Sequence, residues 1–448
     1  MKARSIALAL LLASGFSPIA RAQISPPTTS LTQSGGFIGP ATLQTRPSDT
    51  ISTADAPWVH LLYLEGNVRL AVDPVLDIRT GKGTGTGGSH TGFTNVRGGR
   101  WAGRIDDRID FGGTLLEMQR VPLGPAQDWL ALHGGFPGMG TGKLSTTEAG
   151  QTHVDHSLSS AWFKFAPAER FNIEWGIGAH RIGPAIYNAV LSDEVAPAPY
   201  LKLDWQIAPR WKLHYLQRRL QSNERLEADG VREGRYTPMG LAVRAISYTS
   251  RDASSASNAT ITAMTGRLFN ILGRSTEETV ADLGFWPHPS DQRSDSWQGI
   301  SAQINWAELP TFYAQVARSR QHHRWVIGAA YNHEQWQFWV EANGGEGHLA
   351  HNSQLPAPPQ GAAPALWWNA TDSIFTRGQV AGAAWNNGRW TATVELTNAT
   401  TKTNANARIT WLPYQHAPFA INVRAAQWAE QTWWSAGFSS YIHHGRKM

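Results

Sequence analysis

Apolar and polar residues alternate along many short segments of the chain. Phe163 and Phe165 lead into a turn at 166–169, and apolar residues then recur at every second position from Phe171 to Ile177. Three further hairpins with the same pattern are 201–207 with 211–215, 325–331 with 336–340, and 380–384 with 390–396. A period of two places successive side chains on opposite faces of a β-strand. The pattern therefore predicts antiparallel hairpins, most firmly around Asn386-Asn387-Gly388, because Asn-Gly is a strong turn signal.

The connections between these segments alternate in length. Longer ones run through 178–199, 221–238, 267–296 and 342–372, and short turns lie between them. Short turns on one side and long loops on the other are typical of outer-membrane barrels. The alternating segments from Val68 to Ile442 number about eighteen, within a range of about 16–20. We therefore expect an all-β fold, a transmembrane antiparallel up-and-down β-barrel.

Tryptophan is abundant, with 21 residues, and it falls close to the predicted turns. The residues concerned are Trp175, Trp205, Trp211, Trp325, Trp336 and Trp390. A membrane interface would place aromatic girdles at such strand ends. The alternative is a soluble β-sandwich with tryptophan in its core, which does not explain why tryptophan recurs beside turns.

The N-terminus has the pattern of a secretory signal peptide. Lys2 and Arg4 precede an apolar run, and Ala20-Arg21-Ala22 provides a cleavage site after Ala22. We expect a signal peptide at 1–22, a flexible leader or periplasmic plug segment at 23–66, the barrel at 67–442 and a short tail at 443–448. An exported barrel would reside in the outer membrane of a Gram-negative bacterium.

Composition further narrows the possible classes of protein. The chain has no cysteine, which rules out a disulfide framework. No stretch after the signal peptide reaches the roughly 18 apolar residues of a spanning helix. The net charge of +5 is scattered, so no nucleic-acid-binding tail is expected. A mild positive charge would favour binding of acidic polysaccharide or of the phosphates of an outer leaflet. The alternative is that the charge serves solubility alone.

The segment 104–111 carries charges of alternating sign. As one strand it would place Arg104, Asp106, Arg108 and Asp110 on a single face. In a barrel this face would form a charge ladder in the lumen, whereas a soluble sheet would expose it to water. Asp107 interrupts the apolar face and indicates a turn or bulge there.

The chain has no motif that predicts catalysis or a bound cofactor. His322-His323 and His443-His444 are adjacent residues, whose side chains point to opposite faces of a strand. His153 and His156 have a ligand-like spacing without supporting ligands, so no metal is expected. The glycine-rich segment Gly81–His90 lacks the order of a phosphate-binding loop, and we expect an ordinary loop. No nucleophile elbow is present, and a non-enzymatic protein is favoured over a glycosidase.

The stretch Gly178–Asp204 contains Gly183-Pro184, Leu191-Ser192-Asp193, and Pro197 and Pro199 before the next strand. This order resembles the capsule assembly Wzi family of outer-membrane barrels and the related RemB-type gliding proteins, as does the upstream segment 95–98. The resemblance implies a lectin-like protein that binds surface polysaccharide and helps attach or assemble a capsule.

Residues suited to sugars lie in the long loops, where aromatic rings could stack on pyranose faces. The candidates for polysaccharide binding are Arg181, Tyr187, Asp193, Trp286, Trp367 and Trp368. Trp367 and Trp368 could equally belong to a girdle, and the prolines of the stretch are expected to fix its shape. The expected partners are surface polysaccharide, outer-membrane lipid including lipopolysaccharide, and the barrel-assembly machinery. A porin or polysaccharide-export channel and a motility or adhesion accessory barrel remain the alternatives.

Overall fold

The computed structural model describes most of the chain from Leu61 to Ser440. The described residues are 61–85, 88–123, 135–136, 140–148, 150–178, 180, 182–185, 189–190, 197–225, 236–250, 257–270, 294–306, 309–319, 323–333, 335–346, 378–386, 390–399, 402–411, 419–428 and 431–440. Over these ranges the regular structure is β, and none of them holds a helix long and apolar enough to cross a membrane.

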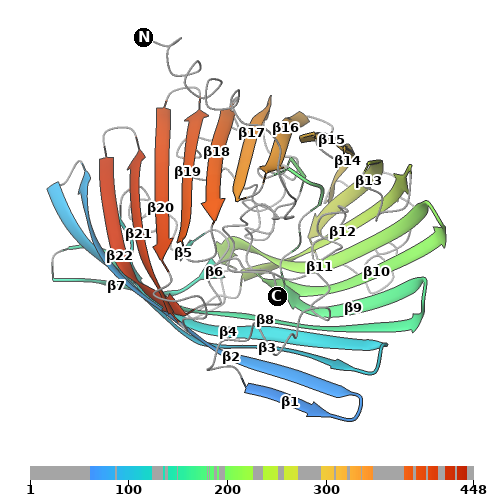
Figure 1. Ribbon diagram of the computed structural model, residues 1–448, viewed down its shortest axis with the longest axis horizontal. Helices are drawn as coiled ribbons and strands as arrows, with labels where there is room; N and C mark the ends of the chain where they lie inside the picture. Colours follow the sequence, from blue (N-terminus) through green and yellow to red (C-terminus); the bar gives the residue numbers. More distant parts are fainter. Residues whose placement is uncertain are drawn as a thin grey trace.

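Most strands that are consecutive in the sequence lie side by side in space (Figure 1). The first twelve are β1 Leu61–Glu65, β2 Val68–Gly85, β3 Gly88–Ile105, β4 Ile109–Val121, β5 Gly135–Phe136, β6 Gly140–Thr141, β7 Lys143–Thr146, β8 Thr152–Ala168, β9 Phe171–Gly178, β10 Ala198–Ala208, β11 Trp211–Arg225 and β12 Tyr236–Thr249. The remainder are β13 Asn258–Asn270, β14 Ser294–Asn305, β15 Thr311–Ser319, β16 His323–His333, β17 Trp336–Glu346, β18 Gly378–Asn386, β19 Trp390–Ala399, β20 Lys402–Trp411, β21 Phe419–Trp428 and β22 Gln431–Ser440.

Nearly every strand pairs with its neighbours in sequence, always antiparallel. The described strands form one 20-stranded sheet and a separate β5–β6 pair. Within the large sheet β1 pairs only with β2, and β7 only with β8. The other eighteen strands run from β2 round to β22, and β22 pairs back onto β2 from Asp77↔Ser439 to Thr84↔Thr432. Figure 1 shows this meeting of the two ends, where β21 and β22 lie beside β2 and β3. The predicted antiparallel barrel of about eighteen strands is confirmed.

The two faces of the sheet differ in chemistry. Large apolar side chains such as Ile300, Val316, Ile327 and Val340 are more than half exposed, and the register places them on one face of β14–β17. The opposite face carries buried polar side chains, among them Gln315 on β15. An exposed apolar face and a polar interior are the arrangement expected of strands surrounded by lipid. We call these the outer and inner faces.

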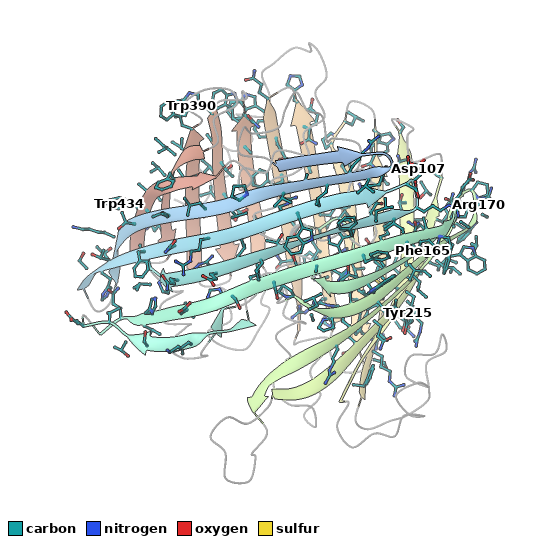
Figure 2. All side chains as sticks on the ribbon, turned by 90° about the horizontal axis from the view of Figure 1, so that it is seen from below. Asp107, Phe165, Arg170, Tyr215, Trp390 and Trp434 are labelled. Carbon is teal, nitrogen blue, oxygen red and sulfur yellow. The ribbon has the colours of Figure 1, made fainter. Side chains whose placement is uncertain are left out.

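The strand ends also differ between the two rims of the barrel. At one rim the strands are joined by short turns such as Glu169-Arg170 and Pro209-Arg210, and β2 begins and β22 ends there. Asp107 and Arg170 lie at the tips of two hairpins of this rim (Figure 2). The other rim has short connections such as β19–β20, but the long connections β9–β10, β13–β14 and β17–β18 also leave from it. By the usual polarity of such barrels, the short turns face the periplasm and the long connections face outward.

Aromatic pairs surround the short-turn rim. Their ring centroids are 4.9 Å apart in Trp211–Tyr248, 5.7 Å in Trp390–Trp411 and 6.3 Å in Trp336–Trp385. Trp205, Trp211, Trp336 and Trp390 are 42–52% exposed on the outer face. This belt is the expected position of an interfacial girdle. Trp175 lies on the same face within β9, whereas Trp325 lies near the opposite rim.

Glycines opposite aromatic residues allow close packing within the sheet. Trp339 lies directly across from Gly382, Trp297 from Gly266, and Tyr313 from Gly328. A Cβ atom at Gly382 would lie 2.1 Å from the Trp339 ring, and one at Gly266 would lie 2.1 Å from the Trp297 ring. Each ring therefore covers the bare backbone of a neighbouring strand, which fixes the register of that pair.

We expect Gly382→Ala to destabilise the barrel by about 1–3 kcal/mol, because the Trp339 ring must leave its place. Gly299→Ala is the matched control, since a Cβ there finds its nearest atom at 3.0 Å and no ring. Urea unfolding in lipid vesicles measures both. Equal effects of the two substitutions would contradict this role of the ring.

Two segments differ from their predicted structure. The loop expected at Gly81–His90 is wrong, because Lys82↔Thr91 and Gly85↔Gly88 are pairs at the end of the β2–β3 hairpin. The bare backbone is needed there, since a Cβ at Gly81 would lie 2.1 Å from the carbonyl oxygen of Trp434. Leu61–Glu65, at the end of the predicted leader, forms β1 against β2.

Candidate functional site in the barrel lumen

The β9–β10 connection packs against the inner face of the barrel. Ile182 is fully buried in a cluster that spans β10 to β14 and includes Tyr200, Leu216, Val243 and Trp297. A second cluster joins Ala185 and Ala189 to Tyr313 on β15 and Val326 on β16. The connection therefore follows the inner wall across seven consecutive strands. We call its described residues 180, 182–185 and 189–190 the inner segment.

A single glutamine holds the inner segment to the far side of this wall. The Gln315 amide donates to the carbonyl oxygen of Ile182 at 2.9 Å, and its own oxygen accepts from the backbone N–H of Ala189 at 3.1 Å. Gly183, at φ 92°, lies between these contacts, and a Cβ there would lie 1.8 Å from the Gln315 amide nitrogen. Only glycine accommodates both this backbone conformation and this close approach.

The start of the inner segment is held by aromatic and charged residues. The His180 ring meets the Tyr200 ring edge-on, with centroids 4.1 Å apart. Arg218, which is fully buried, donates to the carbonyl oxygen of Gly178 at 3.0 Å. Burial, together with the nearby Arg218 guanidinium, holds the pKa of His180 well below its ordinary value, so the ring is neutral.

Below the inner segment, towards the short-turn rim, charged residues lie opposite one another across five strands. The register pairs Arg104 with Asp110, Asp110 with Lys164, Lys164 with Glu174, and Glu174 with Lys202. Charge alternates at every step. Arg104 Nε lies 2.7 Å from Asp110 Oδ1, and Lys202 Nζ lies 3.6 Å from Glu174 and 3.5 Å from Asp204. We call this set the charge row.

Hydrogen bonds extend the charge row across β11 to β13. Asp204 Oδ1 and His214 Nδ1 are 2.6 Å apart, His214 Nε2 and Ser247 Oγ are 3.2 Å apart, and Ser247 bonds Thr262 at 2.9 Å. The Tyr200 hydroxyl donates to Glu174 at 2.6 Å. Asp204, His214 and Ser247 are each at most 9% exposed, so the chain of contacts serves to hold the wall rather than to meet a substrate.

Basic side chains exceed acidic ones on the described inner face. The inner Arg and Lys residues are Arg69, Arg79, Arg100, Arg104, Arg120, Lys164, Lys202, Lys212, Arg218 and Arg324. The inner Asp and Glu residues are Asp77, Asp110, Glu174, Asp204, Glu341 and Glu395. Among the described residues no three His, Asp or Glu side chains come together as a metal site.

The structure brings together only part of the predicted ladder. Arg104 and Asp110 form an ion pair, but residues 106–108 form the β3–β4 turn, and Asp106 has φ 52°. The sign of the charge therefore alternates across neighbouring strands instead of along a single strand. The predicted polysaccharide-binding residues Arg181, Tyr187, Asp193, Trp286, Trp367 and Trp368 all lie outside the described residues.

Sequence reasoning missed Lys164, Glu174, Lys202 and Gln315. The turn predicted at 166–169 was a usable signal, because a hairpin closed there brings Lys164 opposite Glu174. No comparable signal exists for Gln315, whose partners lie 126 and 133 positions away in the chain.

Together these features define an outer-membrane β-barrel with a polar inner wall against which one connection folds. This fold places the protein in the outer membrane of a Gram-negative bacterium, and cleavage after Ala22 stays a prediction.

Comparison with solved structures finds matches of low sequence identity that span most of the chain. OccAB2 of Acinetobacter baumannii is 11% identical with a TM-score of 0.48, covering 83% of this chain and 97% of that one. A BenF-like porin of Pseudomonas fluorescens Pf-5 is 9% identical with a TM-score of 0.43, covering 83% and 98%. Pseudomonas aeruginosa OpdK, solved with vanillate, is 9% identical with a TM-score of 0.44, covering 83% and 98%. No family model matches the sequence, and no curated protein is similar to it.

The resemblance to the Wzi family is therefore wrong, and the capsule-attachment and polysaccharide-binding function that it implied is withdrawn. The stretch that carried the resemblance has a different physical origin. Gly183 is required by the contact with Gln315 and by its backbone conformation, and Pro199 enters β10 opposite Ile177. Both residues are therefore explained by how the connection packs and enters β10, without reference to a function.

Proposed function

We propose that the protein is a porin, a non-enzymatic channel that admits small water-soluble solutes and prefers anions. The observation that carries the proposal is the inner wall, whose described charged residues are mainly basic. A wall of fixed positive charge raises the local concentration of anions and lowers their entry barrier.

The inner segment favours small solutes over polymers. It follows the wall from β10 to β16 and so occupies lumen volume that a polysaccharide strand would need. The charge row and Gln315 hold the wall and the segment in place. Passage of small solutes is therefore a better account than polysaccharide export.

Selectivity tests the proposal directly. In planar bilayers with a KCl gradient, we expect a reversal potential on the anion side. The triple variant Arg79→Gln, Arg100→Gln, Lys164→Gln removes three partly exposed inner charges and should lower the Cl⁻/K⁺ permeability ratio roughly two- to threefold. The control is Arg97→Gln, which removes an exposed charge from the outer face of β3.

A protein without conductance, or one whose triple variant keeps the ratio while the Arg97 variant changes it, would contradict the proposal. Liposome swelling with gluconate and with a neutral sugar of similar size provides an independent measure of the same preference.

A further inference from the structure

The inner segment begins at a buried histidine. His180 is fully buried, and neither its Nδ1 nor its Nε2 atom has a hydrogen-bond partner within the part of the chain that the structure describes. A neutral imidazole carries one donor and one acceptor, and buried groups of this kind are normally paired. Neither the hydrogen bonds that hold the inner segment nor the proposed anion preference involves this ring.

The histidine packs on the wall formed by β9, β10 and β11, which lie side by side (Figure 1). Its ring meets the Tyr200 ring edge-on, with centroids 4.1 Å apart, and Arg218 lies directly opposite Tyr200 in the register. Arg218 also donates to the carbonyl oxygen of Gly178, two residues before His180. The start of the inner segment is therefore packed against an aromatic ring and held near a buried guanidinium.

The charges of these strands disfavour a proton on the histidine ring. Arg218 on β11 and Lys202 on β10 both repel a protonated ring, whereas Asp204 attracts it. Lys202 Nζ already lies 3.5 Å from Asp204 and 3.6 Å from Glu174 on β9, and Asp204 is also bonded to His214. Both carboxylates therefore have partners, and a protonated ring would gain no carboxylate of its own.

The other strands around the start of the inner segment do not supply a counter-ion. On β8 the nearest charged residue in the register is Lys164, which lies opposite Glu174. The inner-face side chains that the structure describes on β12 to β14 are uncharged. A proton on His180 would thus meet two cations and find no acceptor for either ring N–H in this packing.

These contacts make the packing of the inner segment sensitive to protonation. Burial holds the pKa of His180 well below its ordinary value, and Arg218 and Lys202 lower it further. Once the segment leaves the wall, the ring meets water and its pKa returns to about 6.5. The released state then binds the proton more tightly than the packed state, so acidification favours release. The packing is at full strength above about pH 6.5 and weakens as the pH falls below that value.

We propose that His180 is a pH sensor, whose protonation releases the inner segment from the barrel wall. The segment occupies lumen volume, so its release widens the passage. This last step rests on the proposed channel function, whereas the release itself does not. The wider state is favoured in acidic surroundings.

Thiol labelling measures the release directly. The chain has no cysteine, so Ala185→Cys places a single thiol at a fully buried position of the inner segment. When closing is fast, the labelling rate is proportional to the released fraction. Ala168→Cys, exposed beside a short turn, is the reference, and the ratio of the two rates removes the effect of pH on the thiol. In the detergent-purified full chain this ratio should rise about thirtyfold from pH 7.5 to pH 5.0.

A variant that cannot take the proton assigns the effect to His180. In the Ala185→Cys background, His180→Phe keeps an aromatic ring against Tyr200 and should reduce the rise to less than about twofold. His180→Gln, which is also uncharged, repeats the test with a polar side chain should the Phe variant not fold. The matched control is His323→Phe, an exposed outer-face histidine of β16, which should keep the full rise.

A ratio that does not change with pH in the presence of His180 would overturn the proposal, as would a full rise in both His180 variants. Planar-bilayer recordings at pH 7.5 and pH 5.0 test the widening, and we expect the higher-conductance level to be more frequent at pH 5.0. A protein without conductance at either pH contradicts the proposed function alone, because the labelling result supports the sensor by itself. A labelling rise with unchanged conductance in a conducting protein would overturn the widening step.

Discussion

Replacing residues 180–190 with a flexible Gly-Ser segment of equal length should raise single-channel conductance by about twofold or more, because the lumen then loses its obstruction. The buried contacts of Ile182, Ala185 and Ala189 hold the native segment on the wall, and a Gly-Ser segment has no apolar side chains to replace them. Planar-bilayer recordings of the purified barrel measure the change.

A single substitution weakens the attachment of the inner segment to the wall without replacing the segment. Gln315→Ala eliminates the two hydrogen bonds to Ile182 and Ala189, so we expect the open current to fluctuate between a wild-type level and a higher one. A Gly-Ser replacement of residues 320–322, in the β15–β16 connection, is the control. If that control raises the conductance as much as the first variant does, or if the first variant leaves it unchanged, the inner segment is not the constriction.

Lys202→Met should destabilise the barrel by about 3–5 kcal/mol, because it leaves two buried carboxylates without their shared cation. Lys202 is 7% exposed and lies between Glu174 and Asp204, which are 8% and 9% exposed. Removing one partner of a buried set costs far more than removing an exposed pair. Urea unfolding in lipid vesicles, followed by tryptophan fluorescence, measures the loss.

Two further variants test whether the loss of stability comes from the uncompensated buried carboxylates. Combining Lys202→Met with Glu174→Gln and Asp204→Asn removes the uncompensated charge and should recover part of the lost stability. Arg97→Gln disrupts an exposed pair of the outer face and should cost at most about 1 kcal/mol. Comparable losses for Lys202→Met and Arg97→Gln would show that the charge row does not stabilise the wall.

The fold could be predicted from the sequence because each strand carries its own signal. Outer-face residues such as Leu213, Ile246 and Ile300 recur at period two, and the turns fall between them. A hairpin needs only local information, so the strand number and the antiparallel order follow from a count of alternating segments.

The candidate site was beyond such reasoning, because its contacts join distant segments. A glutamine on β15 and a glycine in the β9–β10 connection carry no sign in the sequence that they meet. In the charged segment 104–111 the turn or bulge expected at Asp107 is confirmed, but the charge ladder along a single strand is wrong. Alternation along one strand and alternation across neighbouring strands produce similar local patterns, and the turn at 106–108 decides between them.

One edge of β2 pairs with two different strands, β1 and β22. Its first part, Val68 to Val72, pairs with β1, whereas Asp77 to Thr84 pair with β22. The β1–β2 hairpin is local and forms early, while the seam joins residues more than 340 positions apart and must form late. A β22 strand that slid along β2 towards Val72 would collide with β1. The β1–β2 hairpin thus limits how far β22 can shift along β2. It sets the stagger between β2 and β22, and with it the diameter and the strand tilt of the barrel.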